Sequence, residues 1–492
     1  MNLLSTGVPH LDEVLGGGLP TGSLIVFAGA PGVGKSILAQ QICFWNATAE
    51  RKAIYYSSIS ERPEKFISHL ETFDFFDRGA LADKVEYINL GEMLQDDQAG
   101  GLAATMDEIV RKCVEEQPSV VVVDSAKAIR DFVGDDRSLR SSIYQLAART
   151  AHAGTTLIFV GEYSSDEIES APEFSLADGI VELAFESNEP LDRRWLRIRK
   201  MRGLKHLDGK HAVRINQTGI TLFIRAETLE PPDGALGQPE GKISTGVLGL
   251  DEMTHGGLPK GGSTIVLGPS GCGKTALALQ FVVKGLETGE HCLYVTFQEN
   301  PYQLIRKAAS FGWDLEPYLA SGHLNTYHVG EGALDLDVVA SFIRALVAGR
   351  SVHRMVIDSL SEMVVVARKS AGFPAYERGL LGWLRAAGVS LLTTSETSSL
   401  GPTAEAIGGL SFLYHNVVLL RYIAQESEVG RAVAILKMRD SDHDKGLWSF
   451  SITDHGVEVN SKLARVTGLL GWTALIAEPP NPVDKNAESA SG

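Results

Sequence analysis

The sequence predicts two related α/β domains in tandem, each built on a mostly parallel β-sheet flanked by helices. Three observations predict this fold class: a long internal repeat, short apolar runs that alternate with amphipathic stretches, and a glycine-rich loop at the same place in each half. Alternating strands and helices favour a parallel sheet, because each helix returns the chain across the sheet before the next strand begins.

The internal repeat is clear from the first residues. Residues 4–36 (LSTGVPHLDEVLGGGLPTGSLIVFAGAPGVGKS) match residues 243–275 (ISTGVLGLDEMTHGGLPKGGSTIVLGPSGCGKT), and the offset between the copies is the same at Thr6 and at Lys35. A segment rich in Pro and Gly separates the copies and is typical of a linker. We therefore expect a first domain at 1–229, a linker at 230–241, a second domain at 242–465 and a partly disordered tail at 466–492.

Short β-branched runs mark the strands of each domain, and periodic apolar residues mark the helices between them. A helix is expected at Ser36–Asn46, directly after the first glycine-rich loop, and another over residues 102–113, whose apolar residues line one face. The expected strands are Ser23–Ala28, Ala53–Ile59, Val120–Asp124, Thr155–Val160 and Trp195–Ile198 in the first domain, and Ser263–Leu267, Cys292–Phe297, Met355–Asp358, Val389–Thr394, Asn416–Tyr422 and Ala432–Leu436 in the second.

Composition and charge argue against several classes of protein. No apolar run reaches the ~18 residues that a membrane helix requires. The chain opens without a basic and then apolar leader, so we expect a cytoplasmic protein. Four scattered cysteines without a CxxC pair argue against a metal site or a disulfide framework. The formal net charge of −16 argues against a nucleic-acid partner, because phosphate neutralisation needs a basic surface.

Both glycine-rich loops fit the pattern GxxxxGK[ST], the phosphate-binding loop of nucleotide-binding proteins. Each follows an expected strand and precedes an expected helix, where backbone N–H groups and the helix N-terminus can bind phosphate. A chance glycine-rich turn is the alternative, but it does not explain two copies in one register. The residues expected to bind the phosphates of ATP are Gly29, Gly32, Gly34, Lys35 and Ser36 in the first loop and Gly268, Gly271, Gly273, Lys274 and Thr275 in the second.

A magnesium site is expected beside each loop. The hydroxyls of Ser36 and Thr275 are the Mg²⁺ ligands that the loop pattern predicts. Two buried apolar runs end in Asp124 and Asp358, and an acid at the carboxyl end of such a strand typically holds the water shell of the ion. The alternative is that each aspartate caps the next helix, which is less favoured beside a phosphate loop.

A glutamate follows the second strand of each copy. Glu61 and Glu299 are expected at the carboxyl edge of the sheet, where ligands bind in open α/β folds. A carboxylate there can activate water, or a hydroxyl group, for attack on the γ-phosphate of ATP. The alternative is a solvated loop glutamate that caps the helix beginning two residues later.

A Lys-x-Arg pair ends a late strand in each copy: Lys200 and Arg202 in the first, Lys437 and Arg439 in the second. Such a pair can neutralise γ-phosphate charge from a neighbouring subunit, as an arginine finger does. A solvated strand end is the alternative. We also assign the basic residues around the first pair to an ATP site rather than to a nucleic-acid surface: Arg193, Arg194, Arg197 and Arg199.

These motifs resemble the KaiC family, the two-domain RecA-like ATPases of the cyanobacterial circadian clock and their bacterial and archaeal relatives. The resemblance covers about residues 1–460 and includes the STGxxxLDE entry of each copy, the LKMR segment that contains Lys437, and His443-Asp444-Lys445. It implies a homohexameric double ring, with ATP bound between subunits, where the Lys-x-Arg pairs reach across. It also implies a slow ATPase in the first ring, autophosphorylation in the second, and a timekeeping or signalling role with a KaiB-like protein or a signalling histidine kinase as partner.

The chain departs from the family at three places. The clock protein has two adjacent glutamates at each base position, whereas this chain has Ser60-Glu61 and Gln298-Glu299. The clock protein has a Ser-Thr phosphoacceptor pair in its second domain, and the corresponding residues here are Ser411 and Phe412, which leaves Ser411 as the candidate phosphoacceptor. The C-terminal tail does not match the regulatory tail of the clock protein.

Three functions are open from the sequence. The first is a ring-forming ATPase of the KaiC family with serine autokinase activity. The second is a DNA-dependent ATPase of the broader RecA class, which only the shared fold supports. The third is a nucleotide-gated scaffold in which ATP assembles the ring and hydrolysis is incidental, and the loss of one glutamate per site keeps this alternative open.

Overall fold

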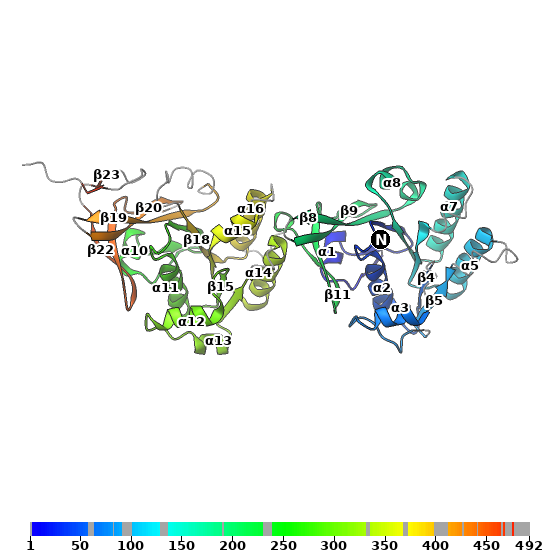
Figure 1. Cartoon of the computed structure of the whole chain (residues 1–492), viewed down its shortest axis with the longest axis horizontal. Helices are drawn as coiled ribbons and strands as arrows, with labels where there is room; N and C mark the ends of the chain where they lie inside the picture. The colour runs from blue at the N-terminus through cyan, green and yellow to red at the C-terminus, as the bar shows by residue number, and fades with distance from the viewer. Residues whose placement is uncertain are drawn as a thin grey trace, which may run out of the picture. The chain divides into compact units, whose positions relative to one another are not determined.

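The chain forms two compact units, Met1–Thr228 and Leu229–Gly492, each of which is described by itself (Figure 1). The computed structural model describes residues 2–57, 63–81, 83–90, 101–127, 136–188, 191–229, 239–330, 335–367, 372–397, 412–425, 428–439, 441–463, 466–467 and 475–476.

The first unit is built on a mixed sheet with the strand order β11-β10-β9-β8-β3-β7-β6-β4-β5. The six strands from β8 to β5 in this order are parallel to one another, and β9, β10 and β11 continue the sheet as antiparallel hairpins. The strands are β3 (Leu24–Gly29), β4 (Ala53–Ser57), β5 (Val85–Asn89), β6 (Val120–Asp124), β7 (Thr156–Glu162), β8 (Gly179–Asn188), β9 (Leu191–Met201), β10 (His211–Asn216) and β11 (Gly219–Phe223).

Helices enclose the parallel part of this sheet. α2 packs over β4, β6 and β7, while α5 and α7 pack against each other (Figure 1). Every residue of β4 and β6 is buried, which is why these strands read as continuous apolar runs rather than as an alternating pattern. The helices are α1 (Leu11–Leu15), α2 (Lys35–Asn46), α3 (Pro63–Leu70), α5 (Gly101–Glu116), α7 (Asp136–His152), α8 (Ser165–Ser170) and α9 (Pro172–Leu176).

The second unit repeats this plan, with the strand order β16-β15-β17-β18-β14-β19-β20-β21-β22. Its strands are β14 (Ser263–Gly268), β15 (Cys292–Thr296), β16 (Leu324–His328), β17 (Arg354–Asp358), β18 (Ser390–Glu396), β19 (Asn416–Gln425), β20 (Glu428–Met438), β21 (Trp448–Thr453) and β22 (Gly456–Lys462). Its helices are α10 (Leu248–Met253), α11 (Lys274–Glu287), α12 (Pro301–Ala309), α13 (Glu316–Ser321), α14 (Leu336–Arg350), α15 (Leu360–Ala367) and α16 (Phe373–Ala386). The predicted fold class, a tandem pair of mostly parallel α/β domains, is therefore confirmed.

A hydrogen-bonded clamp explains the repeated entry motif of each unit. In the first, the carboxylate of Asp12 accepts hydrogen bonds from the Thr6 backbone N–H at 2.8 Å and from the Thr6 hydroxyl at 2.6 Å. Asp251 accepts the same two bonds from Thr245, both at 2.7 Å. The clamp lies between two short strands that pair with each other, β1 (Leu3–Leu4) with β2 (Leu19–Pro20) and β12 (Lys242–Ile243) with β13 (Leu258–Pro259). The motif therefore fixes how the chain enters the phosphate-loop strand.

The predicted strands are found with small shifts at their ends. The late strand of the first unit spans Leu191–Met201 in place of Trp195–Ile198, because it pairs along its length with β8. In the predicted tail, β23 (Val466–Thr467) pairs with β24 (Leu475–Ile476), which also contacts β19. The linker segment 230–238 and the residues from 477 onward lie outside the described part of the chain.

Candidate functional site

The two phosphate loops have the same backbone form. Each follows the central strand, β3 or β14, and ends where α2 or α11 begins at a lysine. Gly34 and Gly273, the residues just before these helices, have φ values of 106° and 112°. Only glycine adopts such a conformation without strain, which explains the glycine at this place in the motif. The amino ends of both helices thus point their free N–H groups toward the loop.

The first glycine of each loop is required for a different reason. A Cβ atom on Gly29 would lie 1.9 Å from the carbonyl oxygen of Leu183 in β8, and one on Gly268 would lie 2.9 Å from the carbonyl oxygen of Leu420 in β19. The loop therefore packs directly against the neighbouring strand and leaves no room for a side chain. The remaining predicted loop residues lie in the same turn and at the start of the helix: Gly32, Lys35 and Ser36 in the first domain, and Gly271, Lys274 and Thr275 in the second.

Three of the predicted residues of the first domain form one polar cluster. Lys35 Nζ donates to the Ala30 carbonyl oxygen at 2.7 Å. Burial lowers the pKa of Lys35, while the carboxylates of Glu162 and Asp124 act in the opposite direction. Burial raises the pKa of Asp124, and hydrogen bonds from Tyr55 and Ser36 oppose that rise. Asp124 therefore lies within reach of both the loop lysine and the loop serine, as predicted for a magnesium-supporting acid.

The second domain holds its aspartate with different partners. Lys274 Nζ donates to the carbonyl oxygens of Gly268 and Pro269 at 2.9 and 2.8 Å. Asp358 accepts a hydrogen bond from Tyr294 OH at 2.8 Å, and a second from the hydroxyl of Thr394. Burial keeps the pKa of the Tyr294 phenol well above its usual range, so this tyrosine stays a hydrogen-bond donor.

Sequence reasoning missed a carboxylate in each domain. β7 lies between the loop strand β3 and the aspartate strand β6 and ends in Glu162, which pairs in register with Gly29. β18 occupies the same place in the second domain, and its last residue, Glu396, pairs with Gly268. Both side chains are exposed at the carboxyl edge of the sheet. The repeat contained the signal, because each glutamate follows its strand-ending aspartate by the same number of residues.

Of the two candidate bases, the structure describes only Glu299. Glu61 lies outside the described residues, together with Ser60. Glu299 forms an ion pair with Lys307 of α12 through Oε1. Its Oε2 atom is buried and has no hydrogen-bond partner within the described residues. The carboxylate of Glu299 also contributes to raising the pKa of Tyr294, the tyrosine that holds Asp358, so it lies close to the predicted magnesium site.

The Lys-x-Arg pairs lie far from the phosphate loop of their own domain. Lys200 Nζ donates to the Phe174 carbonyl oxygen at 3.5 Å, and Arg202 pairs with Asp178 at 3.2 Å. In the register, Met201 pairs with Gly179, which in turn pairs with Ile25 near the amino end of β3. The loop begins four residues further along β3, about 13 Å away at ~3.3 Å per residue.

The Lys-x-Arg pair of the second domain, Lys437 and Arg439, lies at the corresponding place in its sheet. Lys437 Nζ donates to the Tyr414 carbonyl oxygen at 2.8 Å, and Arg439 donates to the Phe412 carbonyl oxygen at 2.9 Å. The candidate phosphoacceptor Ser411 lies outside the described residues, directly before Phe412 in the sequence.

Other members of the basic cluster have partners within the sheet. Arg197 and Arg199 both bind the buried carboxylate of Glu182, at 2.7 and 2.8 Å. Arg194 stacks on the Phe185 ring, with its guanidinium carbon 4.7 Å from the ring centroid. Glu182 pairs in register with Ala28, just before the phosphate loop, so this network supports the strand beside the loop.

A buried carboxyl group lies beside the anchor of Lys437. Glu377 of α16 is buried, and burial raises its pKa to about 7. Tyr414 OH donates to Glu377 Oε1 at 2.9 Å. The other oxygen, Oε2, is buried without a hydrogen-bond partner in the described part of the chain. A neutral, protonated carboxyl group suits such a dry site better than a charged one.

The fold and the site together define a class: a nucleotide-binding protein with two P-loop domains, each with a strand-ending aspartate near its loop, buried in the first domain and partly buried in the second. A family model for the KaiC ATPase matches residues 4–227 and 243–464. The chain therefore belongs to the KaiC family of ATPases, and its two domains are of the RecA-like type predicted.

Individual relatives match over nearly the whole chain. The circadian clock protein KaiC3 of Synechocystis sp. is 27% identical over 96% of this chain and 94% of its own length. The circadian clock oscillator protein KaiC of Thermosynechococcus vestitus is 27% identical over 96% of this chain and 91% of its own length. That of Prochlorococcus marinus is 25% identical over 94% and 93% of the two chains.

The described residues hold neither a membrane-crossing helix nor a separate metal-binding cluster. No helix among them is long and apolar enough to cross a membrane. They contain no cluster of three or more His, Cys, Asp or Glu side chains that could hold a metal ion. A magnesium site at a phosphate loop needs no such cluster, because a loop hydroxyl and the nucleotide itself supply ligands.

The raised pKa of Glu377 predicts a pH-dependent stability. The folded chain keeps a proton on this group up to about pH 7, whereas the unfolded chain releases it near the usual value of 4.5. Stability of the second domain should therefore fall as the pH rises from about 4.5 through about 7, by about 3 kcal/mol at most. Glu377→Gln should remove this slope, as measured by urea unfolding at pH 5 and pH 8. Glu287→Gln, at an exposed site, is the control; an unchanged slope in Glu377→Gln would contradict the assignment.

Proposed function

We propose that both domains bind ATP with Mg²⁺ at their phosphate loops and that the protein works as a ring of identical subunits. The observation that carries this proposal is the duplicated site. In each domain, the phosphate loop with its lysine and hydroxyl group lies at the carboxyl edge of the sheet, and the strand that carries the aspartate ends at the same edge. Ser36 with Asp124, and Thr275 with Asp358, would hold the magnesium ion. When bound, the ion neutralises charge on the transferred phosphoryl group.

The position of the Lys-x-Arg pairs supports the proposed ring. Their anchors are at the amino end of the central strand, opposite the edge that carries the loop of the same domain. A cation held there cannot serve its own loop, but it can serve the loop of a neighbouring subunit. A head-to-tail contact of this kind closes into a ring when the rotation between subunits allows it. We infer that Lys200, Arg202, Lys437 and Arg439 act across subunit interfaces, in a homohexamer like the one implied by the family resemblance.

Subunit mixing tests this arrangement. Lys35→Ala should weaken ATP binding at its own loop, and Arg202→Ala should lose first-domain turnover, because each removes one half of a shared site. Rings assembled from an equal mixture of the two variants should regain about a quarter of that turnover, since one interface in four then has both intact halves. ATP hydrolysis by the mixed rings is the measurement.

The matched control separates the two geometries. Parent chains mixed equally with the Lys35→Ala, Arg202→Ala double variant should keep about a quarter of first-domain turnover for a shared site and about half for a site within one chain. No recovery in the first mixture, with half retained in the control, would exclude action across the interface.

Glu61 and Glu299 are the proposed bases, and the ion pair of Glu299 with Lys307 favours a second candidate function for the second domain. A carboxylate held by a lysine is a weaker base than a free one. ATP at the second loop would then serve assembly, as in a nucleotide-gated scaffold, with little hydrolysis. The first domain would keep its ATPase role.

Two substitutions distinguish these roles. If Glu299 is the base, Lys307→Met should raise second-domain turnover severalfold by freeing the carboxylate, and Glu299→Gln should lower it by about 100-fold or more. A scaffold predicts that both variants keep the turnover and the assembly of the parent. Phosphate release and ring formation by sedimentation are the measurements, and Lys260→Met, at an exposed lysine, is the control.

Autophosphorylation at a single residue, Ser411, is the remaining part of the proposal. It would mark the state of the second ring for a partner, which the family resemblance suggests is a KaiB-like protein or a signalling histidine kinase. The chain would then act in cytoplasmic timekeeping or signalling. The support is the family membership and the identity of the residue at this position.

Labelled nucleotide tests this step directly. Incubation of the full chain with Mg²⁺ and γ-labelled ATP should place label on the peptide that contains Ser411, and Ser411→Ala should remove it. Ser441→Ala, in the same domain, should keep the label. Release of phosphate without labelled protein would rule out the autokinase and leave the nucleotide state as the signal.

A further inference from the structure

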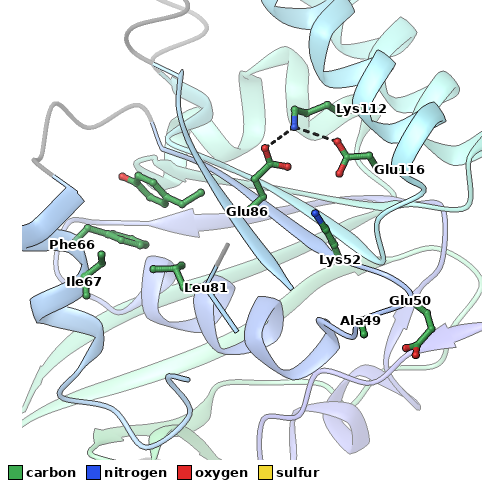
Figure 2. A pocket seen from close by; sticks show the side chains of 10 residues that line it. Ala49, Glu50, Lys52, Phe66, Ile67, Leu81, Glu86, Lys112 and Glu116 are labelled. Carbon is green, nitrogen blue, oxygen red and sulfur yellow. Dashed lines mark hydrogen bonds and ion pairs between the residues drawn. The ribbon is translucent and has the colours of Figure 1, made fainter. Parts of the chain in front are cut away.

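The first domain has an open cavity of about 840 Å³ at the amino ends of β4 and β5. This is the edge of the sheet opposite the phosphate loop. Figure 2 shows that its lining is divided into two parts. Phe66, Ile67 and Leu81 form an apolar side, and Lys52, Glu86 and Lys112 belong to a charged side. The cavity therefore suits a ligand that has one apolar end and one charged end.

On the charged side, Lys52 has no carboxylate partner among the described residues. Lys112 Nζ donates to Glu86 at 2.6 Å and to Glu116 at 3.2 Å, so these three groups satisfy one another. Lys52 also lines the cavity, beside this cluster (Figure 2). Its ammonium group has no carboxylate partner within the part of the chain that the structure describes. A ligand carboxylate would supply that partner, as a charge-assisted hydrogen bond.

The apolar side connects to the predicted magnesium site through packed aromatic rings. Phe66 lies 4.2 Å from Tyr87 and 5.8 Å from Tyr55 between ring centroids. Tyr55 donates the hydrogen bond to Asp124 described above. A ligand that presses on Phe66 therefore contacts a chain of packed side chains that ends at the aspartate.

We propose that this cavity is a regulatory binding site for a small carboxylate with an apolar body. The carboxylate pairs with Lys52, and the body covers Phe66, Ile67 and Leu81. Occupancy changes first-domain turnover through Phe66, Tyr55 and Asp124; only this effect on turnover depends on the proposed ATPase function. Polyphosphates do not fit, because Lys52 can balance only one negative charge and the three carboxylates of the lining repel further ones: Glu50, Glu86 and Glu116.

Among the described residues of the second domain, a histidine replaces the lysine of this site. His291 occupies the repeat position of Lys52, directly before β15. Its ring stacks on that of His323 with 4.6 Å between centroids and lies 6.4 Å from that of His353. Stacked imidazole rings take the place of the lysine at the corresponding edge, so we expect one ligand per chain.

Calorimetric titration of the full chain with 3-phenylpropanoate, without nucleotide, tests the binding site. We expect saturable binding of one molecule per chain and no binding of the neutral amide, 3-phenylpropanamide. Lys52→Met, which keeps the aliphatic stem, should raise Kd about tenfold or more, because it removes the charged partner. Lys260→Met should leave Kd unchanged. Leu81→Trp, which fills the apolar side and keeps Lys52, should also abolish binding, and thermal melting checks that each variant folds.

The outcomes are distinct from those for the ATPase, because binding is measured without ATP. No saturable binding, or equal Kd in the parent and Lys52→Met, would overturn the site. Binding of the amide as tightly as the carboxylate would overturn the role of Lys52. Binding that leaves first-domain ATP turnover unchanged would overturn the regulatory role. A change in turnover in the parent that is absent in Lys52→Met would support the whole proposal.

Discussion

Both domains depend on one geometric constraint, which is that parallel strands end at the same edge of their sheet. In the first domain the strands β3, β7 and β6 end at this edge in Gly29, Glu162 and Asp124; Gly29 pairs with Glu162, and Asp124 pairs with Val160, two residues before Glu162. The phosphate loop follows β3, and α2 then covers the sheet with its amino end at the loop. Positive potential from that helix end and negative charge from the strand ends therefore meet at one place.

This edge is polar but partly buried, and burial determines how its groups are held. Taking Lys35 and Asp124 out of water disfavours the charged form of each, and their proximity opposes that cost. A tyrosine on the neighbouring strand donates to the aspartate in each domain, Tyr55 to Asp124 and Tyr294 to Asp358. The second domain thus keeps a tyrosine partner for its aspartate, although the other partners of the aspartate have changed.

The two copies have diverged more at their periphery than at the loop. In the second domain, the Thr394 hydroxyl donates an additional hydrogen bond to Asp358. The candidate base Glu299 forms an ion pair with Lys307. At the opposite edge, the first domain has an open cavity beside Lys52, whereas the second has stacked histidines at the corresponding place. A shared loop and aspartate with different surroundings would allow the two domains to differ in how they use a bound nucleotide.

The sequence by itself determined the duplication, the fold class and the loop residues, because these depend on local patterns. A GxxxxGK[ST] loop between a strand and a helix has one backbone solution, and the repeat confirmed its register. Only the tertiary structure decided which residues from distant parts of the chain become neighbours. Glu162 and Glu396 were missed because their role depends on β7 and β18 lying between the loop strand and the aspartate strand. The pairing of Glu299 with Lys307, and the position of Lys200 far from its own loop, also depend on strand order and register, which no local pattern specifies.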